Sequence, residues 1–433
     1  MSTSDCLGVN NKGHLTIGGK DTLELVKEYG TPLYVMDEGM IRANCGRYIS
    51  SIANHYGGKG AVVFAGKAFC CKAICALAAE EGMALDAVSS GELYTALKAD
   101  FPPERILLHG NNKTDEDIKY ALRCKVGRVV VDNIYELNRV NEAAAQLGIK
   151  QQVQLRVTPG VDPHTHEFVR TGQIDSKFGF ALQTGEAMNA ARLGAELKNI
   201  SLAGAHCHIG SQILDVSTFV LAAEIMTGFI ADVRDELGVT LGELNLGGGF
   251  GIRYTAGQDT PPEYESYIEA VSGGISKICS QRGIDKPYLF IEPGRSIVGP
   301  AGITLYTVGA LKEIPGIRAY LSVDGGMTDN PRFALYGSRY TMVIANRAAD
   351  PANKTYTVAG RCCESGDLLG KDVPIQEAKT GDILAVFATG AYNYSMASNY
   401  NRLPKPPVVF VKDAEARLVV KRQTLEDIIQ NDL

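Results

Sequence analysis

The chain has 433 residues, 45% of them hydrophobic, and a net charge of −6 with acidic and basic residues interspersed. This length exceeds what one ordinary core needs, so we expect two domains, or a large barrel with an addition. No basic block or aromatic–basic ladder marks a nucleic-acid surface, so we expect no nucleic acid partner.

The first residues, MSTSDCLGVNNKGH, lack the charged and then apolar regions of a secretory signal. No apolar run approaches the roughly 18 residues that a membrane span requires. We therefore expect a cytoplasmic protein without membrane association. The ten cysteines include the adjacent pairs Cys70-Cys71 and Cys362-Cys363 and show no CxxC spacing, so reduced thiols are expected rather than disulfides or a structural zinc.

Between about residues 38 and 295, short apolar runs alternate with stretches that carry apolar residues at three- and four-residue intervals, such as CKAICALAAEEG. The eight strand candidates are 61–64, 84–88, 106–108, 129–131, 153–157, 202–205, 244–246 and 288–291. Eight parallel strands that alternate with helices predict a (β/α)8 TIM barrel, with an open doubly wound sheet as the competing arrangement.

After Gly299 the pattern changes to strand-rich segments such as ITLYTVGALKEI, KTYTVAG and DILAVFATGAY. This change predicts a mostly β C-terminal domain, a sandwich or barrel. The N-terminal stretches HLTIGG and TPLYVMD also have the strand pattern, so we expect them to join that domain. The predicted division is a barrel over 38–297 and a β domain made of 1–37 and 298–433.

The C-terminal ends of the predicted barrel strands are unusually polar, and barrel enzymes place their working groups there. In chain order the groups at these ends are Lys67, Asp86 with Ser89-Ser90-Gly91-Glu92, His109-Gly110-Asn111-Asn112, Arg156, His206-Cys207-His208-Ile209-Gly210-Ser211, Gly247-Gly248-Gly249, and Glu292-Pro293-Gly294-Arg295. Together these side chains predict a functional rim.

Several of these residues have a functional and an ordinary interpretation. Lys67 is either a solvated loop lysine or an amine in an enclosed site, where it can form a Schiff base with an aldehyde. The glycine triplet is either a tight turn or three backbone amides that suit a phosphate, with Ser211 and the Gly294-Arg295 amides as further donors.

The two histidines and the glutamate also leave alternatives open. His206 and His208 alternate onto one face of a strand and could bind a metal, but no third ligand of suitable spacing is evident, so we expect no metal. An imidazole in this position could instead lie flat against an aromatic cofactor. Glu292 either closes a turn or holds a proton on a pyridine nitrogen.

A lysine, a phosphate cradle and a carboxylate are the three parts that pyridoxal 5′-phosphate requires. The sequence also resembles the fold-type III pyridoxal-phosphate-dependent decarboxylases, the group of the ornithine and arginine decarboxylases, which have an alanine-racemase-like barrel. The resemblance covers almost the whole chain and rests on the stretches TPLYVMD (31–37), FAGKAF (64–69), LDAVSSGELYTA (85–96), HGNNKT (109–114), DSKFGF (175–180), HCHIGSQI (206–213), LNLGGGFG (244–251), EPGRSIVGPAG (292–302), DGGMTDNPRFALYG (324–337), CCESGD (362–367) and ATGAYNYSMASNYNRLPKP (388–406).

The resemblance implies a role for each matching residue. Lys67 would carry the cofactor, His208 would stack on its ring, and Glu292 would pair with the pyridine nitrogen. The phosphate would lie among Ser211, Gly247, Gly248, Gly249, Gly294, Arg295 and Tyr392, with Asp86 and Arg156 as supports near the ring. Cys363 would protonate the carbanion from the partner subunit, which implies a homodimer with shared active sites.

The implied reaction is decarboxylation of meso-2,6-diaminopimelate to L-lysine and CO2, the last step of lysine biosynthesis. The far end of this substrate carries a carboxylate and an ammonium. Arg295, Arg332 and Tyr336 can hold the carboxylate, Glu364 can take the ammonium, and Tyr392 also lines the substrate. Without the resemblance, Arg332 could equally be a surface arginine, and Cys363 could be a small buried apolar residue.

Alternatives within the family are a decarboxylase of a D-amino acid or of a carrier-bound amino acid, and an alanine-racemase-like enzyme. Gly337 stands where ornithine decarboxylases have an acidic residue, which disfavours ornithine. A regulatory pyridoxal-phosphate-binding homologue is the non-enzymatic alternative, but it would be expected to lose Lys67, Glu292 or Cys363. Asn393 and Ser90 stand where the family pattern has glycines, so the resemblance does not determine the conformation of the loop near Tyr392.

Overall fold

The computed structural model describes residues 5–161 and 176–433. The DSKFGF stretch therefore begins one residue outside the described part of the chain. Two compact units divide the chain: one comprises 1–43, 252–260 and 295–433, and the other comprises 44–251 and 261–294. The division at 38 and 297 made from the sequence remains a prediction.

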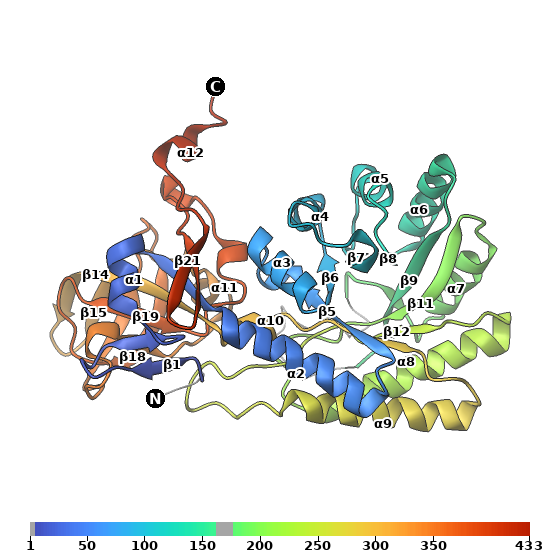
Figure 1. The fold of residues 1–433 in the computed structure, drawn as a ribbon, viewed down its shortest axis with the longest axis horizontal. Helices are drawn as coiled ribbons and strands as arrows, with labels where there is room; N and C mark the ends of the chain where they lie inside the picture. The colour runs from blue at the N-terminus through green and yellow to red at the C-terminus, as the bar shows by residue number, and fades with distance from the viewer. Residues whose placement is uncertain (1–4, 162–175) are drawn as a thin grey trace. The chain divides into compact units, whose positions relative to one another are not determined.

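The second unit is a closed barrel of eight parallel strands, as predicted (Figure 1). Each neighbouring pair is parallel, and β13 pairs with β5 to close the ring. All eight predicted strands are present, because strands covered on both sides read as continuous apolar runs. Their bounds are β5 Gly60–Ala65, β6 Ala84–Ala87, β7 Ile106–Leu108, β8 Arg128–Val131, β9 Gln151–Thr158, β11 Ile200–His206, β12 Glu243–Asn245 and β13 Tyr288–Ile291, with the short β10 Phe180–Ala181 beside β9.

Helices follow the barrel strands, and the successive helices α3 to α6 contact one another around its outside (Figure 1). Several begin at side-chain caps that the strand-end sequences supply, such as Ser89, the capping box of Thr114 with Asp117, and Asn133. Their bounds are α2 Glu38–Tyr56, α3 Lys72–Glu80, α4 Ser90–Leu97, α5 Asp115–Arg123, α6 Ile134–Leu147, α7 Glu186–Glu196, α8 Val216–Leu237 and α9 Tyr264–Arg282.

Helix α8 corrects one sequence-based expectation. By length and composition it is apolar enough to cross a membrane, with a mean hydropathy of 1.6, so the prediction that no run approaches this length was wrong. Just over half of that stretch, 56%, is buried, and α8 packs against α9 and β11. Such burial is typical of a helix that covers a barrel, and we interpret α8 in this way.

The first unit is built mainly from sheet, as predicted. Strand β4, from the N-terminal TPLYVMD stretch, lies between β14 and β20, antiparallel to the first and parallel to the second. The N-terminal segment therefore does join the C-terminal sheet. The strand bounds are β4 Leu33–Asp37, β14 Gly302–Ile314, β15 Arg318–Val323, β16 Met342–Ile344, β17 Lys354–Ala359, β18 Leu368–Ile375, β19 Ile383–Phe387, β20 Val408–Lys412 and β21 Glu415–Val420.

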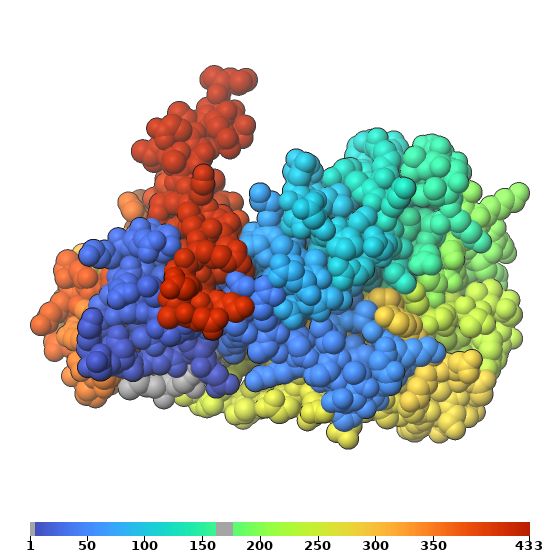
Figure 2. Space-filling model, in the orientation of Figure 1, coloured from blue at the N-terminus to red at the C-terminus, as the bar shows by residue number. Residues whose placement is uncertain are grey.

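The remaining elements of this unit are short. The HLTIGG stretch forms part of a separate three-stranded sheet, with bounds β1 Leu7–Val9, β2 Leu15–Ile17 and β3 Lys20–Asp21. The helices are α1 Thr22–Tyr29, α10 Arg295–Val298, α11 Arg332–Tyr336 and α12 Leu425–Ile429. Figure 2 shows the C-terminal segment, in dark red, projecting from the surface, and α12 has no buried residue.

Candidate active site

Lys67 lies in a single 3-10 turn, Gly66–Ala68, directly after β5. The glycine before it is required, because a Cβ at Gly66 would lie 2.7 Å from the backbone oxygen of Asp86 on the neighbouring strand. The close approach of the two strand ends thus sets the position of Lys67. Its side chain is exposed in this chain, so the structure does not show the enclosure that the sequence led us to expect.

The glycine triplet follows β12 in a space that admits no side chains. A Cβ would lie 2.5 Å from Cys207 O at Gly247, 2.1 Å from Glu292 O at Gly248 and 2.5 Å from Gly210 O at Gly249. These contacts are with backbone atoms of the loops after two other strands. The triplet therefore lets three chain segments meet at the mouth of the barrel.

Two amides of this triplet make hydrogen bonds within the protein, and the role of all three glycines at a phosphate remains a prediction. The Gly247 N–H donates to Asn245 Oδ1 at 3.0 Å, and the Gly248 N–H donates to His208 Nδ1 at 3.2 Å. Gly247 and Gly248 therefore shape the turn, and Gly249 is the candidate phosphate donor of the triplet for which no such bond is seen among the described residues. Gly294 is similarly constrained, since its Cβ would lie 2.9 Å from that of Ala65, beside Lys67.

Glu292, directly after β13, is buried and surrounded by polar side chains. Its Oε1 accepts a hydrogen bond from Asn245 Nδ2 at 2.8 Å and lies 3.0 Å from His109 Nε2, while its Oε2 lies 3.4 Å from His206 Nε2. Burial alone would raise the pKa of Glu292, but His109 and His206 outweigh it and hold that pKa well below the ordinary value. Glu292 is therefore a buried carboxylate that can accept a proton-bearing partner.

Two buried histidines of the β11 end, His206 and His208, have lowered pKa values. Burial lowers the pKa of His206 to about 4. Burial, with the nearby Lys67 charge as the next cause, lowers the pKa of His208 well below its ordinary value. His208 Nδ1 accepts from the Gly248 amide, so a neutral ring carries its proton on Nε2. A neutral imidazole suits contact with the face of an electron-poor aromatic ring.

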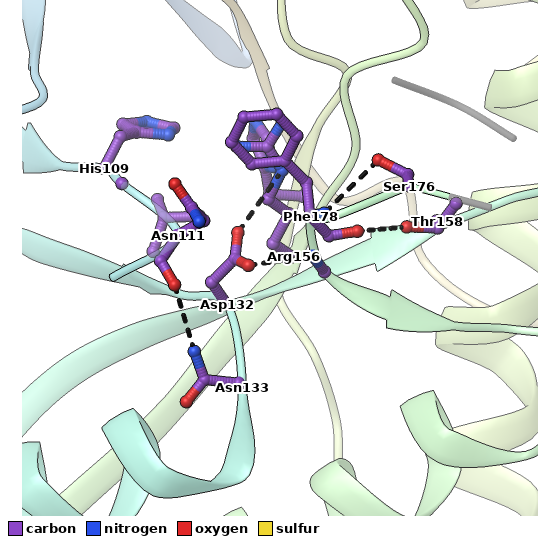
Figure 3. A network of polar contacts seen from close by, with 12 residues as sticks. His109, Asn111, Asp132, Asn133, Arg156, Thr158, Ser176 and Phe178 are labelled. Atoms are coloured by element: carbon purple, nitrogen blue, oxygen red, sulfur yellow. Dashed lines mark hydrogen bonds and ion pairs between the residues drawn. The ribbon is translucent and has the colours of Figure 1, made fainter. Parts of the chain in front are cut away.

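Asp86 and Arg156 lie near this carboxylate, and their role as supports of the cofactor ring remains a prediction. The Asp86 carboxyl is buried, with Oδ1 3.9 Å from His109 Nε2, and Lys67, Glu292 and Arg156 are among the charges that act on it. Arg156 has its guanidinium 4.2 Å from the centre of the Phe178 ring and its Nε 3.7 Å from Asp132 (Figure 3).

The Phe178 loop is itself fixed by the strands of the barrel. Its carbonyl accepts a hydrogen bond from Thr158 at 2.7 Å, and the next amide, of Gly179, donates to Asp132 at 2.9 Å (Figure 3). Asp132 thus contacts both the loop and the arginine. Arg156 is held between a ring and a carboxylate, which sets its position near Glu292.

The barrel residues fit pyridoxal phosphate. Among the described residues, Asp86 Oδ1 and His206 Nδ1 are buried without a hydrogen-bond partner. Unpaired buried polar atoms of this kind, close to an ionised Glu292, are typical of a site that completes its hydrogen bonds with a ligand. An exposed amine and a glycine cradle lie at the same strand ends, which are the complementary parts that this cofactor needs.

The sheet unit brings together four of the predicted substrate and phosphate residues. The Arg295 guanidinium lies 4.7 Å from the centre of the Tyr392 ring, and that of Arg332 lies 5.5 Å from the same centre. Arg332 also lies 5.3 Å from the Tyr336 ring. These contacts gather two positive charges around one tyrosine, an arrangement that suits a bidentate anion.

Two further tyrosines hold these arginines in place. Arg332 Nε donates to Tyr340 Oη at 3.0 Å, and Arg295 Nη1 donates to Tyr254 Oη. Arg332 is buried, so its interpretation as a surface arginine is wrong.

Asn393 has a φ of −96°, so the position next to Tyr392 does not need the glycine of the family pattern. Ser90, the other departure, begins α4 and bonds to Asp117.

Cys363 and Glu364 lie in an exposed loop of the same unit. The Cys363 amide donates to Asn401 Oδ1 at 2.8 Å, and the thiol is free and exposed, unlike that of the buried Cys362. Among the described residues no hydrogen bond or ion pair links Cys363 or Glu364 to Arg295 or Arg332. The structure of the single chain therefore does not bring these two residues together with the arginine pair.

Sequence reasoning missed His109 and Asn245 as neighbours of Glu292. His109 was visible as part of the polar rim, and Asn245 as the one polar residue inside LNLG, but neither pattern assigns a partner.

The argument against a metal was also incomplete, because the ligand atoms of His109, His206 and Glu292 lie within 4.8 Å of one another. The absence of a metal remains a prediction.

Comparisons with known proteins agree with this chemistry. Residues 41–299 match the family described as pyridoxal-dependent decarboxylase, pyridoxal binding domain. The diaminopimelate decarboxylases of Bacillus subtilis (strain 168) and Staphylococcus aureus (strain COL) are 51% and 46% identical, each over 98% of this chain and over 96% and 98% of the relative. The crystal structure of a diaminopimelate decarboxylase from M. jannaschii with L-lysine has a TM-score of 0.93 at 35% identity and covers 100% of this chain and 99% of that one. The chain therefore belongs to the pyridoxal-dependent decarboxylases, and among them to the diaminopimelate decarboxylases, as a carboxy-lyase that works with pyridoxal phosphate.

Proposed function

We propose that this chain removes one carboxylate of meso-2,6-diaminopimelate to give L-lysine and CO2, as the last step of lysine biosynthesis. The observation that carries the proposal is the buried Glu292 carboxylate, contacted by His109, His206 and Asn245 at the same barrel mouth as the amine of Lys67. When bound, pyridoxal phosphate supplies a ring that accepts the electron pair left by the departing carboxylate.

In this proposal each barrel residue does one task. The Lys67 amine would hold the cofactor. Glu292 would accept the hydrogen bond of the protonated ring nitrogen, and neutral His208 would lie against the ring. Asp86 and Arg156 support the ring, while the phosphate is held by donors that include Ser211, Gly249 and Gly294, in a turn shaped by Gly247 and Gly248. Arg295 and Tyr392 keep the phosphate role that the family resemblance implies.

The distal end of the substrate calls for both signs of charge. Arg332, Arg295 and Tyr336 are proposed to hold the distal carboxylate, and Glu364 the distal ammonium, with Tyr392 against the substrate. The gathering of both arginines around the Tyr392 ring supports the carboxylate half of this proposal.

Cys363 is proposed to return the proton to the α-carbon, acting from the partner subunit of a homodimer. Its exposed thiol supports this role, because a group that serves a second subunit has to be accessible on its own chain. A neutral thiol can donate its proton to the carbanion and is left as a thiolate, which suits the last step of the reaction.

The test is CO2 release by purified protein with pyridoxal phosphate and, in separate reactions, meso-diaminopimelate, L-lysine, L-ornithine and D-lysine. We expect release from meso-diaminopimelate and at most trace release from the other three. Release from L-ornithine or D-lysine, with none from meso-diaminopimelate, would overturn the substrate assignment while leaving the cofactor chemistry intact.

A further inference from the structure

Asn245 is the last residue of β12, and its side chain is completely buried in the barrel, with 0% exposure. Its Nδ2 donates to Glu292 Oε1 at 2.8 Å and to Gln154 Oε1 at 3.2 Å. Its Oδ1 accepts from the Gly247 amide at 3.0 Å. One short side chain thus contacts both the carboxylate at the end of β13 and the first residue of the glycine turn.

The orientation of this amide follows from its neighbours. Arg128 donates to both oxygens of Glu243, so both oxygens of Glu243 are acceptors. Gln154 Nε2 donates to Glu243 Oε2 at 2.8 Å, which turns the oxygen of Gln154 toward Asn245. Asn245 must then present its NH2 group to Gln154 and Glu292, and its oxygen to Gly247.

The chain of contacts therefore runs through the barrel interior from the Arg128–Glu243 ion pair to the mouth. A polar chain of this kind costs desolvation, whereas the interior of a TIM barrel is normally filled by branched apolar side chains. Its members all make hydrogen bonds within the protein, and its upper end terminates at Glu292 and the glycine turn, which in the proposed function would face opposite ends of pyridoxal phosphate. This placement distinguishes Asn245 from an amide that only fills the core.

We propose that Asn245 is a positioning residue that couples the two ends of the cofactor site. It holds the Glu292 carboxylate in place for the ring nitrogen, and it holds the glycine turn in place for the phosphate. The inference rests on the proposed role of Glu292 and adds to it a residue that touches neither substrate nor cofactor.

The test compares how apoenzymes bind three probes: pyridoxal phosphate, 1-deazapyridoxal phosphate, which lacks the ring nitrogen, and pyridoxal, which lacks the phosphate. Two ratios of dissociation constants follow for each protein. The nitrogen ratio compares the deaza analogue with pyridoxal phosphate, and the phosphate ratio compares pyridoxal with pyridoxal phosphate. A general loss of stability weakens all three probes and leaves both ratios unchanged.

In Asn245→Leu, which is close in shape but makes no hydrogen bonds, we expect both ratios to fall at least threefold. Asn245→Ser, which is too short to reach both partners, is the second variant should the first fold poorly, and the same result is expected. The matched control is Gln376→Leu, a buried amide of the sheet unit that bonds to the Ile344 amide, for which both ratios stay within twofold of the wild type.

The inference is overturned if neither ratio changes in the Asn245 variants, or if only one of them changes. Glu292→Gln separates this failure from failure of the proposed function. If Glu292→Gln leaves the nitrogen ratio unchanged, the role of Glu292 is wrong; if it lowers that ratio while Asn245→Leu does not, only the coupling role of Asn245 is wrong.

Discussion

Lys113 forms a buried ion pair behind the barrel mouth, and breaking it tests how the site is supported. Its ammonium donates to Glu136 Oε1 at 2.7 Å, to the Gly110 carbonyl at 2.8 Å and to the Val130 carbonyl at 2.7 Å. Both charged side chains are only 2% exposed. Gly110 follows His109, so the pair fixes the loop that carries a neighbour of Glu292.

Lys113→Met leaves the Glu136 charge buried and unpaired, and we expect it to destabilise the apoenzyme by about 3–5 kcal/mol. Burial raises the pKa of Glu136, and Lys113 opposes that rise. Without the lysine, the pKa of Glu136 in the folded protein lies further above its value in the unfolded chain. The loss of stability in Lys113→Met should therefore be larger at pH 8 than at pH 5, where the Glu136 carboxyl can take a proton.

The assay is urea unfolding of the wild type, Lys113→Met, Glu136→Gln and the double variant, followed by far-UV circular dichroism at both pH values. The double variant should recover at least half of the loss, because it leaves no buried charge without a partner. A loss below about 1 kcal/mol in Lys113→Met, or strictly additive losses in the double variant, would refute the reasoning.

Three further results are expected. In Gly248→Ala the new Cβ meets the Glu292 backbone, so the affinity for pyridoxal phosphate, measured by spectroscopic titration, should fall by about 100-fold. The control is Gly273→Ala in α9, where the Cβ meets open space and the affinity should be unchanged. Cys363→Ser should lower kcat by about 100-fold or more with little change in KM, and an unchanged kcat would remove Cys363 as the proton donor. Burial raises the pKa of Glu92 to about 7, above its unfolded value, so the wild type loses stability as the pH rises from about 4.5 through 7. In urea unfolding, the stability of Glu92→Gln relative to the wild type should therefore increase by up to about 3 kcal/mol between pH 4 and pH 8. An equal stability difference between the two proteins at both pH values would contradict this.

The barrel could be predicted because its strands are short apolar runs bounded by polar loops. Residues 61–64 and 288–291 were placed on strands correctly, since burial on both faces leaves a continuous apolar signal. The N-terminal strand 33–37 was assigned to the C-terminal sheet from its pattern and from the change after Gly299. Helix α8 was misjudged because a helix that covers a barrel can be as apolar as one in a membrane.

The polar groups around Glu292 could be predicted only in part. Lys67, His208 and Glu292 stand at strand ends, where position along the chain already indicates function. Asn245 and His109 both contact Glu292, which lies 47 positions after the first and 183 positions after the second. No local pattern in the sequence predicts contacts over such separations. For the same reason the sequence could not show that the Gly247 and Gly248 amides are used within the protein.

Covalent attachment of pyridoxal phosphate to Lys67 is the central claim, and peptide mass spectrometry after borohydride reduction tests it most directly. We expect a digest of the reduced holoenzyme to carry one pyridoxyl group on the peptide that contains Lys67, and Lys67→Ala to carry none. A pyridoxyl group on another lysine, or none on the Lys67 peptide of the wild type, would contradict the account.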